Sequence, residues 1–261
     1  MKAIFTLSKL TKTVALFTML AMLLGVQGCI HDKKNANATG FYDSGSITEL
    51  SVSDLQVMIN GNRMILMSVA TGLLYDGTIT MNERSFTGTL TAFQGGVSPT
   101  SVTVSGVVII KSKITGTITG GGVALDGSFT ADYSTENAQQ AAATRIDNVG
   151  NNYWAGVLYT GPNVHGFSID NTGKVSHFDI TITGPFSGCA IIVDTSNITP
   201  IAGTNMFTIT VSWNTCDNAA VDGTYTGMVA IKTVTNSDDT LAVALSNSVA
   251  GVISNYSYTT F

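Results

Sequence analysis

Cysteine and histidine could supply the most distinctive chemistry in this chain, and both are scarce. The sequence contains three cysteines and three histidines: Cys29, Cys189, Cys216, His31, His165 and His177. A metal site or a nucleophilic site needs several such side chains close together. His31 lies in a polar segment that we predict to be a spacer, and His165 and His177 lie on separate predicted strands or turns. The sequence also lacks a nucleophile elbow, a phosphate loop, an HExxH motif and a calcium loop. We therefore predict no catalytic residues, no metal ligands and no enzymatic activity.

Cys29 follows a segment typical of an export signal. Lys2, Lys9 and Lys12 precede an uncharged apolar run at residues 14–26. A run of about 13 residues is too short to cross a hydrocarbon core of about 30 Å, which needs roughly 20 helical residues. Its length and its basic flank instead fit the hydrophobic region of a secretory signal peptide.

The residues Val26-Gln27-Gly28-Cys29 resemble the lipobox of bacterial lipoproteins, in which an aliphatic residue, a tolerant position and a small residue precede cysteine. The resemblance implies that residues 1–28 are a signal peptide cleaved after Gly28. It also implies that Cys29 carries a thioether-linked diacylglycerol and an acylated amino group, with fatty acids such as palmitate. This covalent lipid is the only added group we expect. The alternative is an ordinary secretory signal with a chance cysteine.

Two or three acyl chains give stable anchoring, since each buried CH₂ contributes about 0.8 kcal/mol. Ile30 follows the cysteine, where an aspartate tends to retain Gram-negative lipoproteins in the inner membrane. The resemblance therefore implies an outer-membrane protein, on either the periplasmic or the surface side.

Composition limits the partners of the mature chain. Charged residues make up 11% of the sequence and hydrophobic residues 44%, which allows a sizeable folded core. Loss of the three signal lysines leaves nine basic residues against 17 acidic ones, a net charge of −8. That charge disfavours binding to nucleic acid and an electrostatic grip on anionic lipid. It also leaves the lipid as the expected link to the membrane.

Cys189 and Cys216 form a second prediction. With Cys29 used for the anchor, these two remain as a pair in an exported, oxidising setting, and we predict a disulfide between them. A hairpin turning near Ala202-Gly203 would place them opposite each other, with the bridge on the polar face away from Trp213. A redox or metal site is the alternative, but the closest candidate ligand, His177, has no paired partner.

Period-two alternation runs through most of the chain after about residue 50. Phe207, Ile209, Val211 and Trp213, for example, alternate with threonine and serine. One apolar face and one threonine-rich face are typical of antiparallel strands with a core on one side and water on the other. We predict an all-β fold, an antiparallel barrel or sandwich of short strands with one short connecting helix.

The predicted organisation has five parts. These are the signal peptide at residues 1–28, a lipidated flexible spacer at 29–46, a first β module at 47–133, a helical linker at 134–152 and a second β module with the disulfide hairpin at 153–261. A faint internal repeat indicates either two related halves or a chance recurrence of short motifs rich in glycine and threonine. Residues 104–110 resemble 186–192, and residues 126–130 resemble 222–226.

Two function classes follow. Residues 150–256, with Gly223-Thr224-Tyr225-Thr226-Gly227, are similar in texture to uncharacterised β-rich lipoproteins, a resemblance that implies no activity. We expect a lipid-anchored binding or structural module at the outer membrane, with an envelope protein as a possible partner. The alternative is a β-barrel carrier of a small apolar ligand in envelope transport or assembly. A filled barrel favours the first class, and an empty interior favours the second.

Overall fold

A computed structural model of the chain describes residues 34–95, 97–138, 153–157, 164–169, 172–178, 186–232 and 240–259. It places only the backbone of residues 97, 98, 153–157, 164–167, 176–178 and 257–259. Residues 36–261 form one compact unit. The predicted signal peptide, Cys29 and Ile30 lie outside the described residues.

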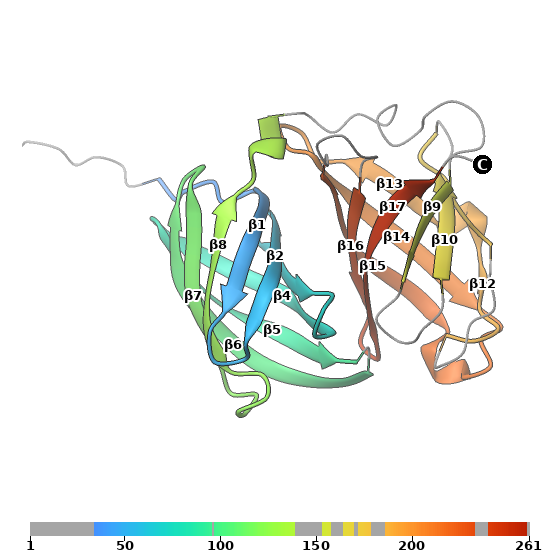
Figure 1. The fold of residues 1–261 in the computed structure, drawn as a ribbon, viewed down its shortest axis with the longest axis horizontal. Helices are drawn as coiled ribbons and strands as arrows, with labels where there is room; N and C mark the ends of the chain where they lie inside the picture. Colours follow the sequence, from blue (N-terminus) through green and yellow to red (C-terminus); the bar gives the residue numbers. More distant parts are fainter. Residues whose placement is uncertain are drawn as a thin grey trace, which may run out of the picture. The chain divides into compact units, whose positions relative to one another are not determined.

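The first eight strands close into an antiparallel barrel (Figure 1). Each strand pairs with the next in sequence, and β1 also pairs with β8 to complete the circle. The strands are β1 (Gly40–Ile47), β2 (Val52–Asn60), β3 (Arg63–Ser68), β4 (Leu73–Asn82), β5 (Ser85–Gln94), β6 (Val97–Ile109), β7 (Lys113–Thr119) and β8 (Gly127–Tyr133).

Apolar side chains fill the inside of this barrel. All eight strands contribute buried residues to one cluster, among them Tyr42, Val57, Leu66, Tyr75, Leu90, Val104, Ile118 and Phe129. An eight-stranded barrel has an interior just wide enough for side chains to fill. The predicted all-β class is therefore confirmed, and the first module is a barrel rather than a sandwich.

Glycines make room for the large rings of this core. Gly116 on β7 pairs with Gly106 on one side and with Phe129 on the other. Gly106 also pairs with Phe86 on β5. A Cβ atom on Gly116 would approach the Phe129 ring to 2.8 Å, so the ring occupies space that another side chain would need.

The predicted spacer at residues 29–46 extends too far, because strand β1 already begins at Gly40. Phe41 and Tyr42 are fully buried, and β1 closes the barrel by pairing with both β2 and β8. The polar composition of this segment hid the strand. Closure of the barrel buries Tyr42 in the barrel core, whereas Phe41 is buried in a second apolar cluster with residues of the C-terminal strands such as Met206 and Ile253.

The remaining strands form a nine-stranded antiparallel sheet in the order β11-β10-β9-β17-β16-β15-β14-β12, with β13 also paired to β14. The strands are β9 (Tyr153–Val157), β10 (Val164–Ile169), β11 (Val175–Phe178), β12 (Ala190–Ile191), β13 (Asn197–Pro200), β14 (Met206–Asn214), β15 (Gly223–Lys232), β16 (Thr240–Ser246) and β17 (Gly251–Thr259).

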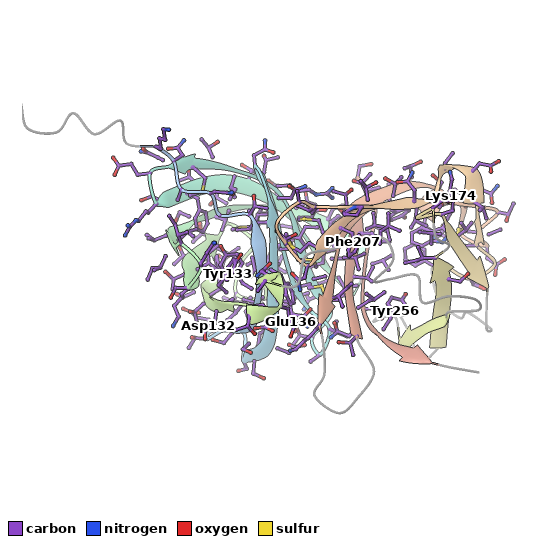
Figure 2. The ribbon with its side chains drawn as sticks, turned by 90° about the horizontal axis from the view of Figure 1, so that it is seen from above. Asp132, Tyr133, Glu136, Lys174, Phe207 and Tyr256 are labelled. Atoms are coloured by element: carbon purple, nitrogen blue, oxygen red, sulfur yellow. A yellow bond between two sulfur atoms is a disulfide. The ribbon has the colours of Figure 1, made fainter. Side chains whose placement is uncertain are left out.

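Both faces of this sheet are apolar along its central strands. On β16, Leu241 and Val243 belong to a core within the sheet. Ala242 and Ala244 belong instead to a cluster shared with outward-facing barrel residues. That shared cluster contains Met58, Ile65, Met67, Leu74 and Phe93 of the barrel and Met206, Met228, Ala230, Ala242, Ala244 and Ile253 of the sheet. The outer wall of β2–β5 is thus covered by the sheet, and Phe207, labelled in Figure 2, belongs to the core on the sheet's other face.

Three short 3-10 helices connect strands. They are η1 (Thr135–Ala138), η2 (Val193–Thr195) and η3 (Ala219–Val221). The predicted helix at 134–152 therefore begins as a single 3-10 turn, and residues 139–152 lie outside the described residues. Within the described part of the chain, no helix is long and apolar enough to span a membrane.

The two proposed repeats have different outcomes. Asp126-Gly127 and Asp222-Gly223 both lead into strands, β8 and β15. Val104-Ser105-Gly106, however, lies within β6, whereas Phe186-Ser187-Gly188 forms a turn. The match between residues 104–110 and 186–192 therefore has no structural counterpart, because the similar short sequences lie in a strand in one module and in a turn in the other.

Candidate functional site

One end of the barrel gathers the features most able to bind another molecule. We call it the proximal end, because β1 begins there. It consists of the start of β1, the end of β8 and three hairpin turns, at residues 60–63, 82–85 and 109–113. The distal end carries the other turns of the barrel, including the loop at residues 120–126.

The hairpin turns of the proximal end follow predicted turn chemistry. Asn60 pairs with Arg63 across a two-residue loop in which Gly61 has φ +60°. Asn82 pairs with Ser85 across a second loop in which Glu83 has φ +56°. The sequence predicts both turns, the first at Asn60-Gly61-Asn62, because asparagine and glycine tolerate positive φ, and the second at Asn82-Glu83-Arg84. Both turns are confirmed, although the positive φ of the second falls on Glu83 rather than on asparagine or glycine.

A cleft of about 480 Å³ opens at this end. Its walls come from the β6–β7 turn, the end of β8, η1 and the β13–β14 turn. The lining residues are Lys111, Tyr133, Ser134, Thr135, Asn137, Ala138 and Gly203. Figure 2 labels Tyr133 at the end of β8 and Glu136 on η1, beside this cleft.

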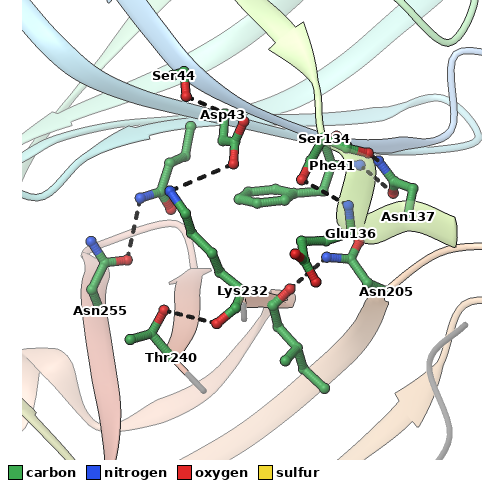
Figure 3. Close-up of polar contacts among 12 residues, drawn as sticks. Phe41, Asp43, Ser44, Ser134, Glu136, Asn137, Asn205, Lys232, Thr240 and Asn255 are labelled. Atoms are coloured by element: carbon green, nitrogen blue, oxygen red, sulfur yellow. Dashed lines mark hydrogen bonds and ion pairs between the residues drawn. The ribbon is translucent and has the colours of Figure 1, made fainter. Parts of the chain in front are cut away.

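Asn137 fixes one wall of the cleft to the barrel. Its side-chain oxygen accepts a hydrogen bond from the Phe41 backbone N–H at 3.0 Å, and its amide nitrogen donates to the Phe41 carbonyl at 2.7 Å (Figure 3). Asn137 is buried, so both bonds are shielded from water. These bonds continue the barrel's hydrogen bonding beyond the last residue of β8.

The cleft presents one cation and one neutral phenol. Lys111 is exposed at the turn. Burial raises the pKa of Tyr133, so its hydroxyl stays protonated at neutral pH. The ring of Tyr133 meets the buried Tyr42 edge-on, with ring centroids 5.3 Å apart. Lys111 and the hydroxyl can hold an anionic or hydrogen-bond-accepting group, and the lining residues contain no cysteine, histidine or carboxylate to supply a base.

Titratable residues do not converge elsewhere in the part of the chain that the structure describes. No three His, Cys, Asp or Glu side chains there could hold a metal ion together. His165 and His177 fall on the neighbouring strands β10 and β11, and the structure places only their backbone. His31 lies outside the described residues, as does Cys29.

The predicted pairing of Cys189 with Cys216 is confirmed as a disulfide. The hairpin between them turns at residues 201–205, since Pro200 pairs with Phe207. A 3-10 turn, η2, then divides the first arm into β12 and β13.

The predicted position of the bridge on the polar face is wrong. Both cysteines are buried in the core of the sheet, against which Trp213 packs. Thr215 adopts φ +56° and ends the strand alternation after Asn214, which turns Cys216 inward. Trp213 also contacts Tyr225 and Phe186, with ring centroids 4.7 and 5.5 Å away. Trp213 was predicted to belong to the core, and it does.

The sequence predicts that Asp43, Asp126, Asp170 and Asp222 form turns, because each lies near glycine or asparagine, and the outcomes differ. Asp126 accepts a hydrogen bond from the Gly121 N–H at 2.7 Å, which confirms its role in the glycine-rich loop. Asp222 accepts from the Cys216 N–H at 3.0 Å and ends η3. Asp43, however, lies on β1 and forms an ion pair with Lys232 at 3.5 Å (Figure 3), so its assignment to a turn is wrong. Asp170 lies outside the described residues.

Sequence reasoning missed a polar cluster that joins the barrel to the sheet. Arg63 of β3 binds both carboxylate oxygens of the buried Asp76 of β4, through Nε at 2.9 Å and Nη2 at 2.5 Å. Arg63 also donates to Thr226 of β15, and Ser246 of β16 donates to Asp76 at 2.6 Å. No local signal could have revealed the link to the sheet, because Thr226 lies 163 residues from Arg63 and Ser246 lies 170 residues from Asp76 in the sequence.

Comparisons with known proteins give little for function. No protein-family model matches the chain, and no curated protein matches it. Among solved structures, the chain is similar to a "putative outer membrane protein" of Bacteroides fragilis NCTC 9343, at 14% identity and a TM-score of 0.27. The match covers 85% of this chain and 97% of that one.

Proposed function

We propose that this protein is an outer-membrane lipoprotein, anchored through lipid on Cys29, whose β-built body serves as a binding or structural module of the envelope. The observation that carries the proposal is the sequence Val26-Gln27-Gly28-Cys29 at the end of an apolar run preceded by lysines. Ile30 supports the outer membrane as the destination. The body has no role in catalysis under this proposal.

The packing of the barrel supports a binding or structural role over the carrier alternative. A carrier of the barrel type would hold its apolar ligand inside, and the core of β1–β8 is occupied by the protein's own side chains. The cleft at the proximal end instead offers Lys111 and Tyr133 to an acceptor group. A partner in the envelope is therefore expected to bind at the surface of the body.

The anchor is tested by labelling cells that express the full chain with radioactive or alkyne-bearing palmitate. The wild-type protein should incorporate label and fractionate with the outer membrane, and Cys29→Ala should do neither. Mass spectrometry should place the mature N-terminus at Cys29. Recovery of unlabelled protein with its leader still attached would refute the anchor.

Partner binding is tested by mild cross-linking in cells, followed by purification of the lipidated protein. A module of the proposed kind should retain a defined envelope component. Lys111→Glu should weaken that retention if the cleft is used, whereas Lys174→Glu, on the sheet, should not. Equal retention by both variants would remove the cleft from the proposal.

A further inference from the structure

The outward-facing residues of β6 change from polar to aliphatic toward the proximal end. Its outward-facing positions are first Ser101, Thr103 and Ser105, all exposed and polar. They are then Val107 and Ile109, which are 45% and 52% exposed, followed by Ile110 in the turn at 47%. We call Val107, Ile109 and Ile110 the aliphatic ridge. Ile110 was predicted to face the core with Val108, but β6 ends at Ile109 and the turn carries Ile110 outward.

The basic residues of the barrel gather at the same end. All four that the structure describes lie there, Arg63, Arg84, Lys111 and Lys113, together with the carboxylates of Glu83, Asp132 and Glu136. Arg63 is bound to Asp76 and Lys113 is paired with Asp132, whereas Arg84 and Lys111 are exposed beside the ridge. The distal end carries Glu49, Asp54 and Asp126, and no lysine or arginine within the described barrel.

The chain joins the barrel next to the ridge. The Ala36 N–H donates to the Glu83 carbonyl at 2.7 Å, and the Val108 N–H donates to the Arg84 carbonyl at 2.8 Å. The first residue of the compact unit therefore lies at the β4–β5 turn, beside the end of β6. Six residues, 30–35, separate Ala36 from Cys29. The seven steps from Cys29 to Ala36 span at most about 25 Å when fully extended.

We propose that the proximal end docks on the surface of the lipid bilayer, with the aliphatic ridge inserted at the headgroup level and Arg84 and Lys111 contacting anionic headgroups. This inference rests on the proposed acylation of Cys29, because the short link then keeps this end near the lipid. Aliphatic side chains with flanking lysines suit the interface, since the lysine stems cover apolar surface while the ammonium groups reach the headgroups.

Charge supports the bilayer as the occupant of the ridge. The mature chain has a net charge of −8, so an anionic bilayer repels most of the body. The acidic distal end is repelled most, whereas exposed cations of the proximal end are attracted within a Debye length. The two effects favour one orientation, with the proximal end toward the membrane.

Fluorescence at a single position tests the docking on the lipidated full chain. Ile110→Cys provides one free thiol, because Cys29 is acylated and the other two cysteines form the disulfide. A polarity-sensitive dye on this thiol should emit at shorter wavelength when the protein is in phosphatidylethanolamine–phosphatidylglycerol vesicles. Brominated acyl chains should quench most of its emission. Val123→Cys is the matched control, because Val123 is an aliphatic loop residue, 97% exposed, at the distal end.

Each outcome decides between the proposals. A dye at position 110 that stays in water, although mass spectrometry shows the acyl chains on Cys29, overturns the docking and leaves the anchor intact. A chain without acyl groups overturns both. A third outcome is a dye at position 110 that stays in water in vesicles without other proteins but is shielded from water in native membranes. This outcome assigns the aliphatic ridge to a protein partner and also overturns bilayer docking.

A double variant in the Ile110→Cys background tests the contribution of the two exposed cations. Arg84→Gln combined with Lys111→Gln should shift position 110 toward water in anionic vesicles and have little effect in neutral phosphatidylcholine vesicles. Quenching that is equally strong with and without the two charges in anionic lipid would remove Arg84 and Lys111 from the contact.

Discussion

At the scale of single residues, a role could be predicted where its partner lies nearby in the sequence. Asp126 accepts its hydrogen bond from a residue five positions away, and its turn role was predicted. Asp43 was misassigned because its partner, Lys232, belongs to a different sheet. The environment of Cys216 depended on the left-handed backbone of Thr215, a conformation uncommon for threonine and not indicated by the sequence.

Glu49 provides a test at this scale. Its two carboxylate oxygens accept hydrogen bonds from the Ser128 N–H at 2.7 Å and the Ser128 hydroxyl at 2.9 Å, fastening the β1–β2 turn to β8. The Ser128 N–H, then the N–H of Glu49 itself and the Ser128 hydroxyl, lower the pKa of this carboxyl from its ordinary 4.5. A lowered folded-state pKa gives stability that is fully present above pH 4.5 and is lost as the pH falls through the lowered value.

We therefore expect Glu49→Gln to lower the melting temperature at about pH 6 and to have little effect near pH 3. Thermal unfolding followed by circular dichroism at the two pH values measures the gap between variant and wild type. Ser128→Ala should reproduce the pH dependence, because it removes one of the same bonds. A gap that is equally large at both pH values would contradict this role for Glu49.

At the scale of elements, the alternation predicted the strands but not which strands are buried on both faces. Residues 64–67 of β3 and 241–245 of β16 are continuous apolar runs, and every one of these residues is buried. Such a run indicates that neither face of the strand meets water. These runs were the available signal for the contact between barrel and sheet. Closure of the barrel had no comparable signal, because pairing of β1 with β8 depends on residues far apart in the sequence.

The close packing of Gly116 against Phe129 gives a prediction for β7. Gly116→Ala places a methyl group against the Phe129 ring and the Ser105 carbonyl, and overpacking of this kind costs about 1–3 kcal/mol. Urea unfolding of the purified protein measures the loss. Thr115→Ala, on the exposed face of the same strand, is the control and should lose less. Phe129→Leu should recover part of the loss when combined with Gly116→Ala, and a double variant as unstable as the sum of the two would argue against this contact.

The disulfide is the second prediction for an element. The loop between Cys189 and Cys216 spans 27 residues, and closing a loop of that size stabilises by roughly 3–3.5 kcal/mol in the chain-entropy model. The double variant Cys189→Ser with Cys216→Ser should lose a comparable free energy of unfolding, measured with urea, because its unfolded chain is no longer restricted by the crosslink. Non-reducing peptide mapping of the exported wild-type protein should show the linked pair. Free thiols in that protein would contradict the prediction.

At the scale of the whole molecule, the barrel and the sheet share an apolar cluster and a few polar contacts. Lys232 pairs with Asp43 (Figure 3), and Gln56 donates to Asn255 at 3.4 Å. The candidate site depends on this arrangement, since the cleft draws Gly203 from the sheet and its other lining residues from the barrel and η1. The sequence could therefore indicate the cysteines and the turns, but not the cleft or the ridge, which arise where the ends of several strands meet.

The cluster around Asp76 is the strongest polar link between the two. Asp76 is buried and accepts from Arg63 and Ser246, while Arg63 also binds Thr226, the residue that pairs with Ser246 across β15 and β16. Arg63→Met leaves the carboxylate without its cation. Removing one partner of a buried pair typically costs about 3–5 kcal/mol, and partial exposure of Arg63 favours the lower end.

We expect Arg63→Met to lower the free energy of unfolding by about 3 kcal/mol, and Ser246→Ala to lower it by about 1.5–2 kcal/mol, the lower range for one hydrogen bond to a charged group. Arg63→Met combined with Asp76→Leu should be more stable than Arg63→Met alone, because no buried charge then lacks a partner. Urea unfolding monitored by tryptophan fluorescence should report the sheet, since Trp154 and Trp213 both lie there. The loss in the double variant is compared with the losses in Arg63→Met and Asp76→Leu measured separately. If it equals their sum, Arg63 and Asp76 act independently. The link between barrel and sheet would then rest on the apolar cluster alone.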